Sequence, residues 1–475
     1  MKTLSELLEN TPVEAIWGDP QVAVGSLVYD SRAAAAGCCF FAVPGTQCDG
    51  HAFIGAAITA GAAAVVCERL PEERPAGVTF VVVKDSQGAM ADMAAACYDH
   101  PSRELKLVGI TGTNGKTTTV TLLFDLVRAM GYRAGLISTV VYRIEERTLP
   151  ATHTTPDSIR LNALMREMAD AGCANCFMEC SSHAIVQERT RGLDFAGGIF
   201  SNITHDHLDY HKTFAEYIRA KKLFFDHLPK GAFALTNTDD RNGRVMVQNT
   251  RAEVHTYSLR AMADFRCRIV EMHLDGMLLR LDGRELWVGL LGRFNAYNLT
   301  AVYGAAVLLG LDRDEVLRVL STLHAVSGRF EVIRASNGTT AVVDYAHTPD
   351  ALENVIQTID ELRTPQQQLL VVCGCGGDRD RTKRPEMAQI AVKYATTAIF
   401  TSDNPRHEDP EAILDEMVAG LEPGARYLRL ADRAEAIRTA VVLARPGDVI
   451  LIAGKGHETY QIVGDVKHHF DDREE

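Results

Sequence analysis

Short apolar runs of strand length alternate with helix-length stretches along most of the chain. The clearest example is the run at 105–110, which leads into a glycine-rich turn and then into a helix that opens at Lys116. Apolar residues recur along this helix at three- and four-residue spacing until Gly131; they are Val120, Leu123, Leu126, Val127 and Met130. This pattern predicts a strand, a tight turn and an amphipathic helix.

Four further apolar runs in the last third of the chain each end in a polar cluster. The runs are 341–344, 369–375, 398–402 and 448–454. Open parallel sheets bind ligands beyond the carboxyl ends of their strands, so these clusters predict one site along one sheet edge. Residues 374–380 partly match a dinucleotide fingerprint, but the third glycine and a fitting downstream acid are missing, so we discount NAD.

The pattern predicts an α/β protein of three domains, since a single core stops growing well below 475 residues. Residues 1–102 form a small N-terminal α/β domain, with strands expected at 26–29 and 38–43. Residues 103–331 form a central P-loop-type domain with a parallel sheet, and residues 332–475 form a C-terminal Rossmann-like α/β domain.

Composition narrows the possible partners. A formal net charge of −13 argues against nucleic acid or an anionic membrane as the main partner, but a small polyanionic substrate needs only a local basic pocket. No apolar run is long enough to span a membrane, and the first residues lack a signal-peptide layout. The eleven cysteines show no framework spacing, which predicts reduced thiols in a cytoplasmic protein. Cys173, Cys176 and Cys180 could bind zinc, but buried thiols are the preferred interpretation.

The turn at 112–117 has the sequence GTNGKT, a shortened phosphate loop in which Ile110 replaces the usual first glycine. Backbone N–H groups and the helix N-terminus would attract a phosphate there. Lys116 would reach the β- and γ-phosphates of a nucleotide, and the hydroxyl of Thr117 would bind Mg²⁺.

Two other segments carry candidate metal ligands. The buried run 174–180 contains Glu179, which suits a second Mg²⁺ ligand next to the phosphate loop, although it could also cap a helix. The histidine-rich segment 205–211 could bind zinc, or it could supply His207 to Mg²⁺. Lys221 and Lys222 lie on an amphipathic helix at 213–225, where solvated lysines are the default interpretation.

The motifs TGTNGKTT (111–118), DYAHTPD (344–350), GCGGDRD (374–380) and GKGHE (454–458) together resemble the Mur ligase superfamily. Asp30 to Glu458 resembles the subgroup that adds the third residue of the peptidoglycan stem peptide. The resemblance implies an ATP- and Mg²⁺-dependent ligase that acts as a monomer. It would join meso-diaminopimelate to UDP-N-acetylmuramoyl-L-Ala-D-Glu through an acyl phosphate.

The resemblance also implies roles for individual residues. Catalysis would involve Lys116, Glu179, His207 and a carbamylated Lys221. The Mg²⁺ ligands would be Thr117, Glu179, His207 and the carbamylated Lys221. ATP would contact Gly112, Thr113, Asn114, Gly115, Lys116, Thr117, Thr118, Asn295, Asn298 and Arg329. The uridine-diphosphate substrate would contact Tyr29, Ser31, Thr46, Gln47, Cys48, His153, Thr154, Thr155, Ser181, Gln187 and Arg189. Diaminopimelate would contact Arg379, Asp403, Asn404, Pro405, Arg406, Gly454 and Glu458.

Other functions stay open at this point. The chain could be the L-lysine-adding ligase of the same subgroup, in which the arginine of DNPR (403–406) is absent. It could also be a sister ligase that adds D-Ala-D-Ala or polyglutamylates folate. The motifs DGHAFI (49–54) and DNPR argue against both of these. A non-catalytic nucleotide-binding regulator would keep the phosphate loop, but it would not need Glu179, His207 and Lys221 together.

Overall fold

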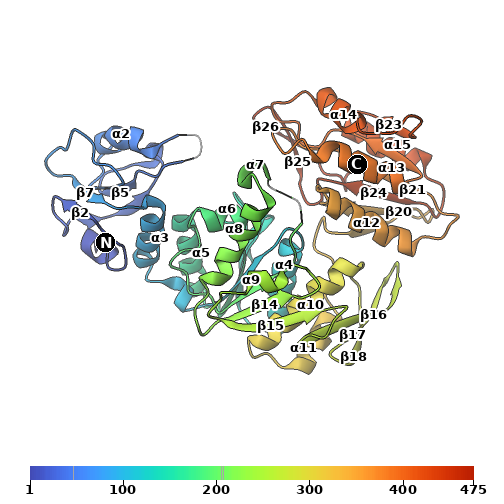
Figure 1. The fold of residues 1–475 in the computed structure, drawn as a ribbon, viewed down its shortest axis with the longest axis horizontal. Helices are drawn as coiled ribbons and strands as arrows, with labels where there is room; N and C mark the ends of the chain where they lie inside the picture. Colours follow the sequence, from blue (N-terminus) through green and yellow to red (C-terminus); the bar gives the residue numbers. More distant parts are fainter. Residues whose placement is uncertain (46–47, 205, 207) are drawn as a thin grey trace.

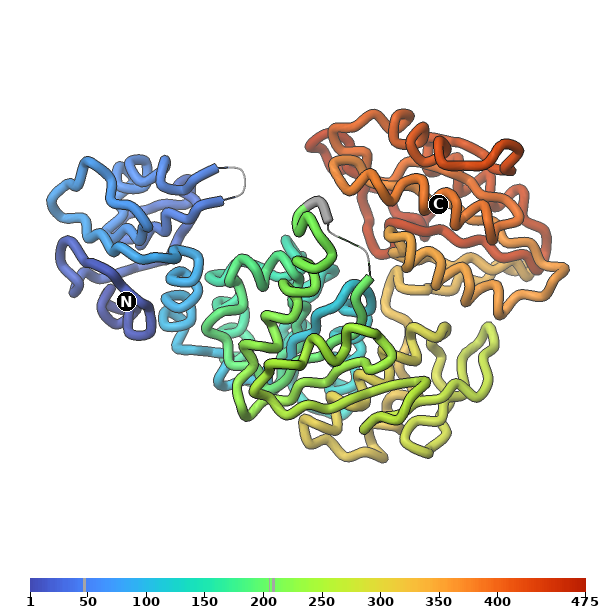
Figure 2. Tube along the Cα trace, viewed as in Figure 1, coloured from blue at the N-terminus to red at the C-terminus, as the bar shows by residue number. Residues whose placement is uncertain are grey.

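The structure is a computed structural model that describes residues 1–45, 48–204, 206 and 208–475. Three α/β units follow one another along the chain, each built on its own main sheet (Figure 1). The N-terminal and C-terminal units lie on either side of the central unit, as the tube in Figure 2 also shows. No helix among the described residues is long and apolar enough to cross a membrane.

The N-terminal unit has a five-stranded sheet in the order β2-β7-β6-β5-β4, parallel except for β2. Its strands are β2 (Ala15–Trp17), β4 (Ser26–Val28), β5 (Cys38–Phe41), β6 (Ala64–Cys67) and β7 (Thr79–Val82), beside the pair β1 (Lys2–Thr3) and β3 (Ala23–Val24). Its helices are α1 (Leu4–Leu7), α2 (Ile54–Thr59), α3 (Ser86–Cys97) and the short η1 (Ser31–Ala33), η2 (Gly50–Phe53) and η3 (Pro101–Arg103). Arg191 of the central unit pairs with Asp92 of α3, which ties the two units together.

The central unit is built on an eleven-stranded sheet with β8 (Lys106–Thr111) in its interior. The remaining strands are β9 (Ala134–Ile137), β10 (Val141–Ile144), β11 (Arg147–Pro150), β12 (Asn175–Glu179), β13 (Gly197–Phe200), β14 (Phe233–Asn237), β15 (Glu253–Ser258), β16 (Phe265–His273), β17 (Gly276–Leu281) and β18 (Arg284–Val288). Across the sheet the order is β11-β10-β9-β12-β8-β13-β14-β15-β16-β17-β18. The neighbours from β9 through β12, β8, β13, β14 and β15 to β16 pair in parallel. The strands at both margins, β10 and β11 on one side and β17 and β18 on the other, pair antiparallel. The parallel sheet that the sequence predicts is therefore present in the interior, and antiparallel hairpins that were not predicted extend it at both edges.

Helices cover this sheet on both faces. They are α4 (Lys116–Ala129), α5 (Ser158–Asp170), α6 (Ser182–Val186), α7 (Leu208–His211), α8 (Phe214–Asp226), α9 (Gly243–Met246), α10 (Arg293–Leu308) and α11 (Arg313–Leu320). The apolar stripe of α4 is buried in the largest core cluster, as its spacing predicts. Cys173, Cys176 and Cys180 are buried free thiols, as the preferred interpretation predicts.

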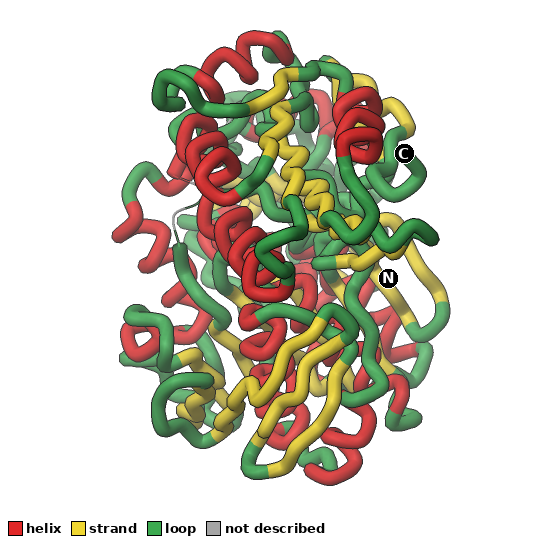
Figure 3. Tube along the Cα trace, turned by 90° about the vertical axis from the view of Figure 1, so that its right-hand side faces the viewer, coloured by secondary structure: helices red, strands yellow, loops and turns green. Residues whose placement is uncertain are grey.

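The C-terminal unit has a six-stranded sheet in the order β19-β20-β24-β21-β22-β23, parallel except for β19. The strands are β19 (Glu331–Arg334), β20 (Thr340–Asp344), β21 (Leu369–Cys373), β22 (Thr397–Phe400), β23 (Tyr427–Arg429) and β24 (Val449–Ala453), followed by the hairpin β25 (Tyr460–Val463) and β26 (Val466–His469). The helices are α12 (Pro349–Leu362), α13 (Lys383–Tyr394), α14 (Pro410–Val418) and α15 (Arg433–Leu443). The four predicted strands are parallel neighbours in the order β20-β24-β21-β22, so their polar clusters follow the same edge of the sheet. Figure 3 shows strands of this unit in yellow near the top of the view, with helices in red beside them.

Candidate active site

The predicted phosphate-binding turn lies between β8 and α4. Gly112 and Gly115 adopt positive φ angles of 153° and 85°. A Cβ atom at Gly112 would lie 1.9 Å from Ser201 Oγ, and one at Gly115 would lie 2.5 Å from Asn298 Oδ1. Only glycine fits these positions, so the bare backbone and the N-terminus of α4 form a cradle suited to a phosphate.

Two lysine side chains meet at this turn. Lys116 Nζ donates to the carbonyl oxygens of Gly112 (3.0 Å) and Thr113 (2.8 Å). Lys221 Nζ, which is buried on α8, donates to the same Gly112 carbonyl at 2.7 Å. Desolvation lowers the pKa of Lys116, and burial together with the charge of Lys116 lowers the pKa of Lys221 well below its usual 10.5. The site therefore favours an uncharged amine at Lys221.

Glu179 is the last residue of β12 and is fully buried next to the phosphate-loop strand. Its carboxylate accepts hydrogen bonds from the backbone N–H (2.8 Å) and the hydroxyl (3.2 Å) of Thr139. Thr117 and Glu179 line the same cavity and supply the oxygen ligands that Mg²⁺ prefers. In the described ranges no three His, Cys, Asp or Glu side chains form a ready-made metal site. His207, the other predicted ligand, lies outside the described residues.

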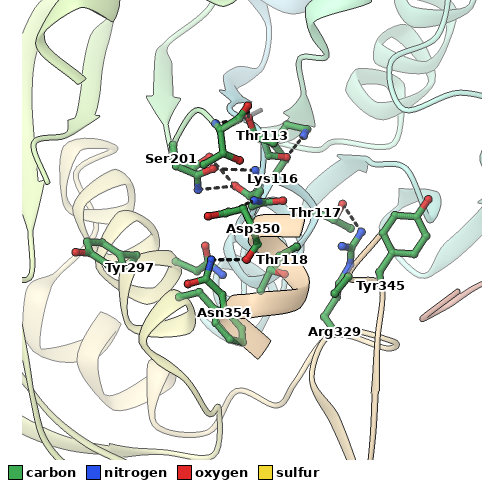
Figure 4. A pocket seen from close by; sticks show the side chains of 18 of the residues that line it. Thr113, Lys116, Thr117, Thr118, Ser201, Tyr297, Arg329, Tyr345, Asp350 and Asn354 are labelled. Atoms are coloured by element: carbon green, nitrogen blue, oxygen red, sulfur yellow. Dashed lines mark hydrogen bonds between the residues drawn. The ribbon is translucent and has the colours of Figure 1, made fainter. Parts of the chain in front are cut away.

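Residues of the C-terminal unit, together with Arg329 of the segment that leads into it, close the opposite side of this cavity (Figure 4). Arg329 Nη2 donates to Thr117 Oγ1 at 3.1 Å, and its guanidinium lies 4.5 Å from the ring centre of Tyr345. Asn114 Nδ2 of the phosphate loop donates to Asp350 Oδ2 at 2.9 Å. The cavity has a volume of about 590 Å³, which suits a nucleotide-sized ligand.

Most of the predicted nucleotide contacts line this cavity: Thr113, Asn114, Gly115, Lys116, Thr117, Thr118, Asn298 and Arg329. Asn295 is placed differently, because it is buried behind Asn298 and accepts a hydrogen bond from Asn298 Nδ2 at 3.1 Å. Tyr297 and Asp239, joined by a 2.8 Å hydrogen bond, also line the cavity.

The residues expected to contact the uridine-diphosphate substrate are spread over two units. Burial and the carboxylate of Asp157 raise the pKa of Tyr29, whereas the charge of Arg189 lowers it. Because Asp157 and Arg189 belong to the central unit, the Tyr29 phenol lies close to that unit. Arg189 in turn donates to the Thr155 carbonyl (2.6 Å) and to Gln187.

Only some of the residues predicted for this substrate line the cavity. Thr154 and Ser181 line it, whereas Ser31, Cys48 and His153 lie outside its lining. Thr46 and Gln47 lie outside the described residues.

The predicted amino-acid contacts meet at the carboxyl ends of β21, β22 and β24. Arg406 is half-buried, has a φ of 51°, and donates from Nη1 to the Gly377 carbonyl at 2.8 Å. Desolvation and the neighbouring charge of Arg379 lower the pKa of Arg406. A Cβ at Gly454 would lie 2.6 Å from Asp403 Oδ2, so the β22 and β24 loops pack closely. Buried Asp403, Asn404 and Pro405 complete this cluster.

A buried lysine organises the same cluster. Lys455 Nζ is fully buried and donates to Asn404 Oδ1 (3.1 Å) and to Glu458 Oε2 (3.0 Å). Asn404 Nδ2 also donates to Glu458 Oε2, at 2.8 Å. The three side chains therefore hold one another in a fixed arrangement, with the Glu458 carboxylate neutralised on one oxygen.

Sequence reasoning assigned no role to Asp350, Tyr345 or Lys455. Asp350 and Tyr345 line the cavity, and Lys455 supports two predicted amino-acid contacts. Each lies in a polar cluster that directly follows a predicted strand, and that position was the available signal. Their partners come from distant segments, so their individual roles could be read only from the structure.

Three family models match the chain. They are described as "Mur ligase family, catalytic domain" (residues 24–98), "Mur ligase middle domain" (110–306) and "Mur ligase, glutamate ligase domain" (328–456).

Curated relatives match over almost the full length. The UDP-N-acetylmuramoyl-L-alanyl-D-glutamate--2,6-diaminopimelate ligase of Bacteroides thetaiotaomicron is 54% identical over 473 residues, covering 99% of this chain and 98% of that protein. The protein of the same name from Chlorobaculum tepidum is 45% identical, covering 94% of this chain and 90% of the relative.

Solved structures agree with these matches. A structure of a 2,6-diaminopimelate ligase of that name superposes with a TM-score of 0.70 at 34% identity, covering 100% of this chain and 97% of the other. The D-alanyl-D-alanyl ligase of Acinetobacter baumannii superposes at 0.64 with 17% identity and 95% coverage of both chains, which supports the fold alone.

Proposed function

The chain belongs to the Mur ligase family, and from that premise we propose that it joins meso-diaminopimelate to UDP-N-acetylmuramoyl-L-Ala-D-Glu. The enzyme is an ATP-dependent, ADP-forming amide ligase of peptidoglycan precursor synthesis. The observation that carries the chemistry is one cavity faced by the phosphate loop on one side and by Arg329, Tyr345 and Asp350 on the other.

The reaction proceeds in two balanced steps. An oxygen of the D-glutamyl γ-carboxylate attacks the γ-phosphorus of ATP, and ADP leaves. The amine of the amino acid then attacks the acyl carbon, loses a proton and expels inorganic phosphate. Lys116 and the N-terminus of α4 would stabilise the phosphate charge. Asp350 of the C-terminal unit and Arg329 of the segment that leads into it both contact the phosphate-binding side of the cavity.

Mg²⁺ would supply charge neutralisation at the phosphate oxygens. Thr117 and Glu179 offer it oxygen ligands, and His207 remains an expected ligand. An amine is a poor ligand for Mg²⁺, but the uncharged Nζ of Lys221 can attack CO₂ and lose a proton to form an anionic carbamate. Its lowered pKa and its position 2.7 Å from the Gly112 carbonyl support this role.

The amino-acid pocket would read the second carboxylate of diaminopimelate. Arg406 offers a planar guanidinium for a carboxylate, and Arg379 lies close enough to perturb it. Glu458, held by Asn404 and Lys455, would accept the distal ammonium, next to Asp403, Pro405 and Gly454. L-Lysine would leave Arg406 without an anionic partner, which disfavours the lysine-adding alternative.

The other assignments are proposals of the same kind. The uridine end would bind at Tyr29, Ser31 and 46–48, with His153, Thr154, Thr155, Ser181, Gln187 and Arg189 near the peptide. Domain boundaries would fall at 102 and 331, and one chain would suffice as a cytoplasmic monomer.

Phosphate release tests this function directly. Sustained release of ADP and phosphate is expected only when ATP, the nucleotide-sugar dipeptide and meso-diaminopimelate are all present, because without the amine the reaction stops at the acyl phosphate after one turnover. Hydrolysis that is independent of both co-substrates would instead point to a nucleotide-binding regulator.

A further inference from the structure

The last residues of the chain lie between two parts of the protein that the proposed reaction uses. Asp471 and Asp472 are buried, with only 6% and 2% of their surface exposed. Arg473 follows them and is partly exposed. We call residues 471–473 the tail clamp.

The first contact of the tail clamp reaches the amino-acid pocket. Asp472 forms a fully buried bidentate ion pair with Arg433, with Nε–Oδ1 and Nη2–Oδ2 distances of 2.7 and 2.8 Å. The same guanidinium donates to the carbonyls of Ala453 (3.1 Å) and Ser402 (3.4 Å). These carbonyls directly precede the loops that carry Gly454 and Asp403. The pair therefore fixes how far apart the two loops stand.

The second contact reaches residues 326–331, the linker between the central and C-terminal units. Arg473 donates from Nη1 to Ser327 Oγ and lies 3.8 Å from Glu331 Oε2. Asp471 holds this guanidinium, accepting from Arg473 Nε at 2.8 Å. Glu331 Oε2 also accepts from the Gly328 backbone N–H at 2.8 Å. Both ends of the linker are thus tied to Arg473.

Arg329 lies between those two ends and extends to the phosphate loop, where it donates to Thr117 Oγ1. The linker is tightly packed there, because a Cβ at Gly328 would lie 2.0 Å from the backbone nitrogen of His457. Any displacement of the linker must therefore move the Arg329 guanidinium relative to Thr117.

We propose that Arg473 is a positioning residue of the ligase. It fixes the linker so that Arg329 meets the phosphate loop, and Asp472 ties the same clamp to the amino-acid loops through Arg433. The inference rests on the proposed function for the identity of the substrates. Its geometric part, from Arg473 through the linker to Arg329, does not depend on which amino acid is added.

The test compares Arg473→Ala with Arg438→Ala. Arg438 is a matched control, because it pairs with Glu475 of the same tail at 2.5 Å and none of its described contacts is to the linker. We expect Arg473→Ala to lower kcat and weaken ATP binding by ~10-fold each, since displaced catalytic groups cost rate steeply. The KM for the nucleotide-sugar dipeptide should stay within about twofold of the unmodified value. Arg473→Lys keeps a donor for Ser327 and should recover most of the loss.

Two results would overturn the proposal. One is an Arg473→Ala enzyme whose kcat and ATP affinity match those of Arg438→Ala. The other is a loss spread equally over all substrates together with a lowered melting temperature, which would mark a purely structural role. ATP affinity measured by calorimetry tests the role of Arg473 without requiring any product to form. If the unmodified enzyme formed no tripeptide, that result would contradict the proposed function but not the role of Arg473.

Discussion

Lys116 and Lys221 donate to the same carbonyl oxygen, that of Gly112, at 3.0 and 2.7 Å. Two ammonium groups so close in a desolvated site repel each other, and this repulsion contributes to the lowered pKa of Lys221. The phosphate loop therefore holds one lysine suited to phosphate binding and one suited to reaction with CO₂.

The first prediction concerns Lys221. With ¹³C-bicarbonate the protein should show a carbamate carbon signal that Lys221→Ala lacks, and that variant should lose at least ~100-fold in kcat. Lys222→Ala is the control, because Lys222 pairs with Asp226 at 2.6 Å on the same helix. A fully active Lys221→Ala enzyme would leave this lysine without a catalytic role.

The second prediction concerns Lys116. Lys116→Ala should slow acyl phosphate formation and lower kcat by ~10²–10³-fold, because phosphate charge would go unneutralised. Binding of the nucleotide-sugar dipeptide should persist, since its uridine contacts are expected in the N-terminal unit. Arg128→Ala, at the other end of α4, should behave like the unmodified enzyme. Near-normal turnover by Lys116→Ala would refute the phosphate-loop assignment.

The third prediction concerns the amino-acid pocket. Arg406→Ala should raise the KM for meso-diaminopimelate by ~100-fold or more and reduce its advantage over L-lysine, because one carboxylate loses its partner. Lys455→Met should also raise this KM, since Glu458 would lose the ammonium that holds it at 3.0 Å. Lys393→Ala, whose largely exposed side chain pairs with Glu353 of α12, is the control. Unchanged KM values in both test variants would place the pocket elsewhere.

The fourth prediction concerns acid stability. Burial and nearby Lys383 lower the pKa of His347 from 6.5 to about 4. Between these pH values the unfolded chain binds a proton that the folded chain does not, so His347 destabilises the fold as pH falls. The difference is on the order of 3 kcal/mol by pH 4. Asp344 acts oppositely below pH 6, because burial raises its pKa to about 6.

Urea denaturation of the unmodified protein and of His347→Gln, compared at each pH, separates these two effects. The unmodified protein should lose stability relative to the variant between pH 6.5 and pH 4. Parallel stability curves for the two proteins would show that His347 titrates normally in the folded state.

The sequence predicted the elements whose signals are local. The 105–131 strand, turn and helix and the four strands of the C-terminal unit follow from runs, periodicity and glycines, and the structure confirms them. The antiparallel margins at 141–150 and 265–288 were missed. The second margin carries a local signal that the prediction did not use, because the β17–β18 turn is Asp282-Gly283 and an Asp-Gly pair is typical of hairpins. The first margin turns at Glu145-Glu146, which gives no such signal.

The residues of the site were likewise predictable only where the local sequence carries a signal. Glu179 ends a strand and Lys116 follows a strand after a short glycine-rich turn, so their positions in the sequence already indicate the carboxyl edge of the sheet. The burial of Lys221 was not evident, because an adjacent lysine pair on an amphipathic helix normally faces solvent. The link from Arg473 to Ser327 joins residues 146 positions apart, and nothing in the local sequence indicates it.

A competition between the two candidate amino acids decides whether this chain adds meso-diaminopimelate. The enzyme is given ATP, the nucleotide-sugar dipeptide, and equal concentrations of meso-diaminopimelate and L-lysine, and the tripeptide products are separated by mass. The diaminopimelate product should dominate, because L-lysine would leave Arg406 without an anionic partner. A predominant lysine product would contradict this expectation.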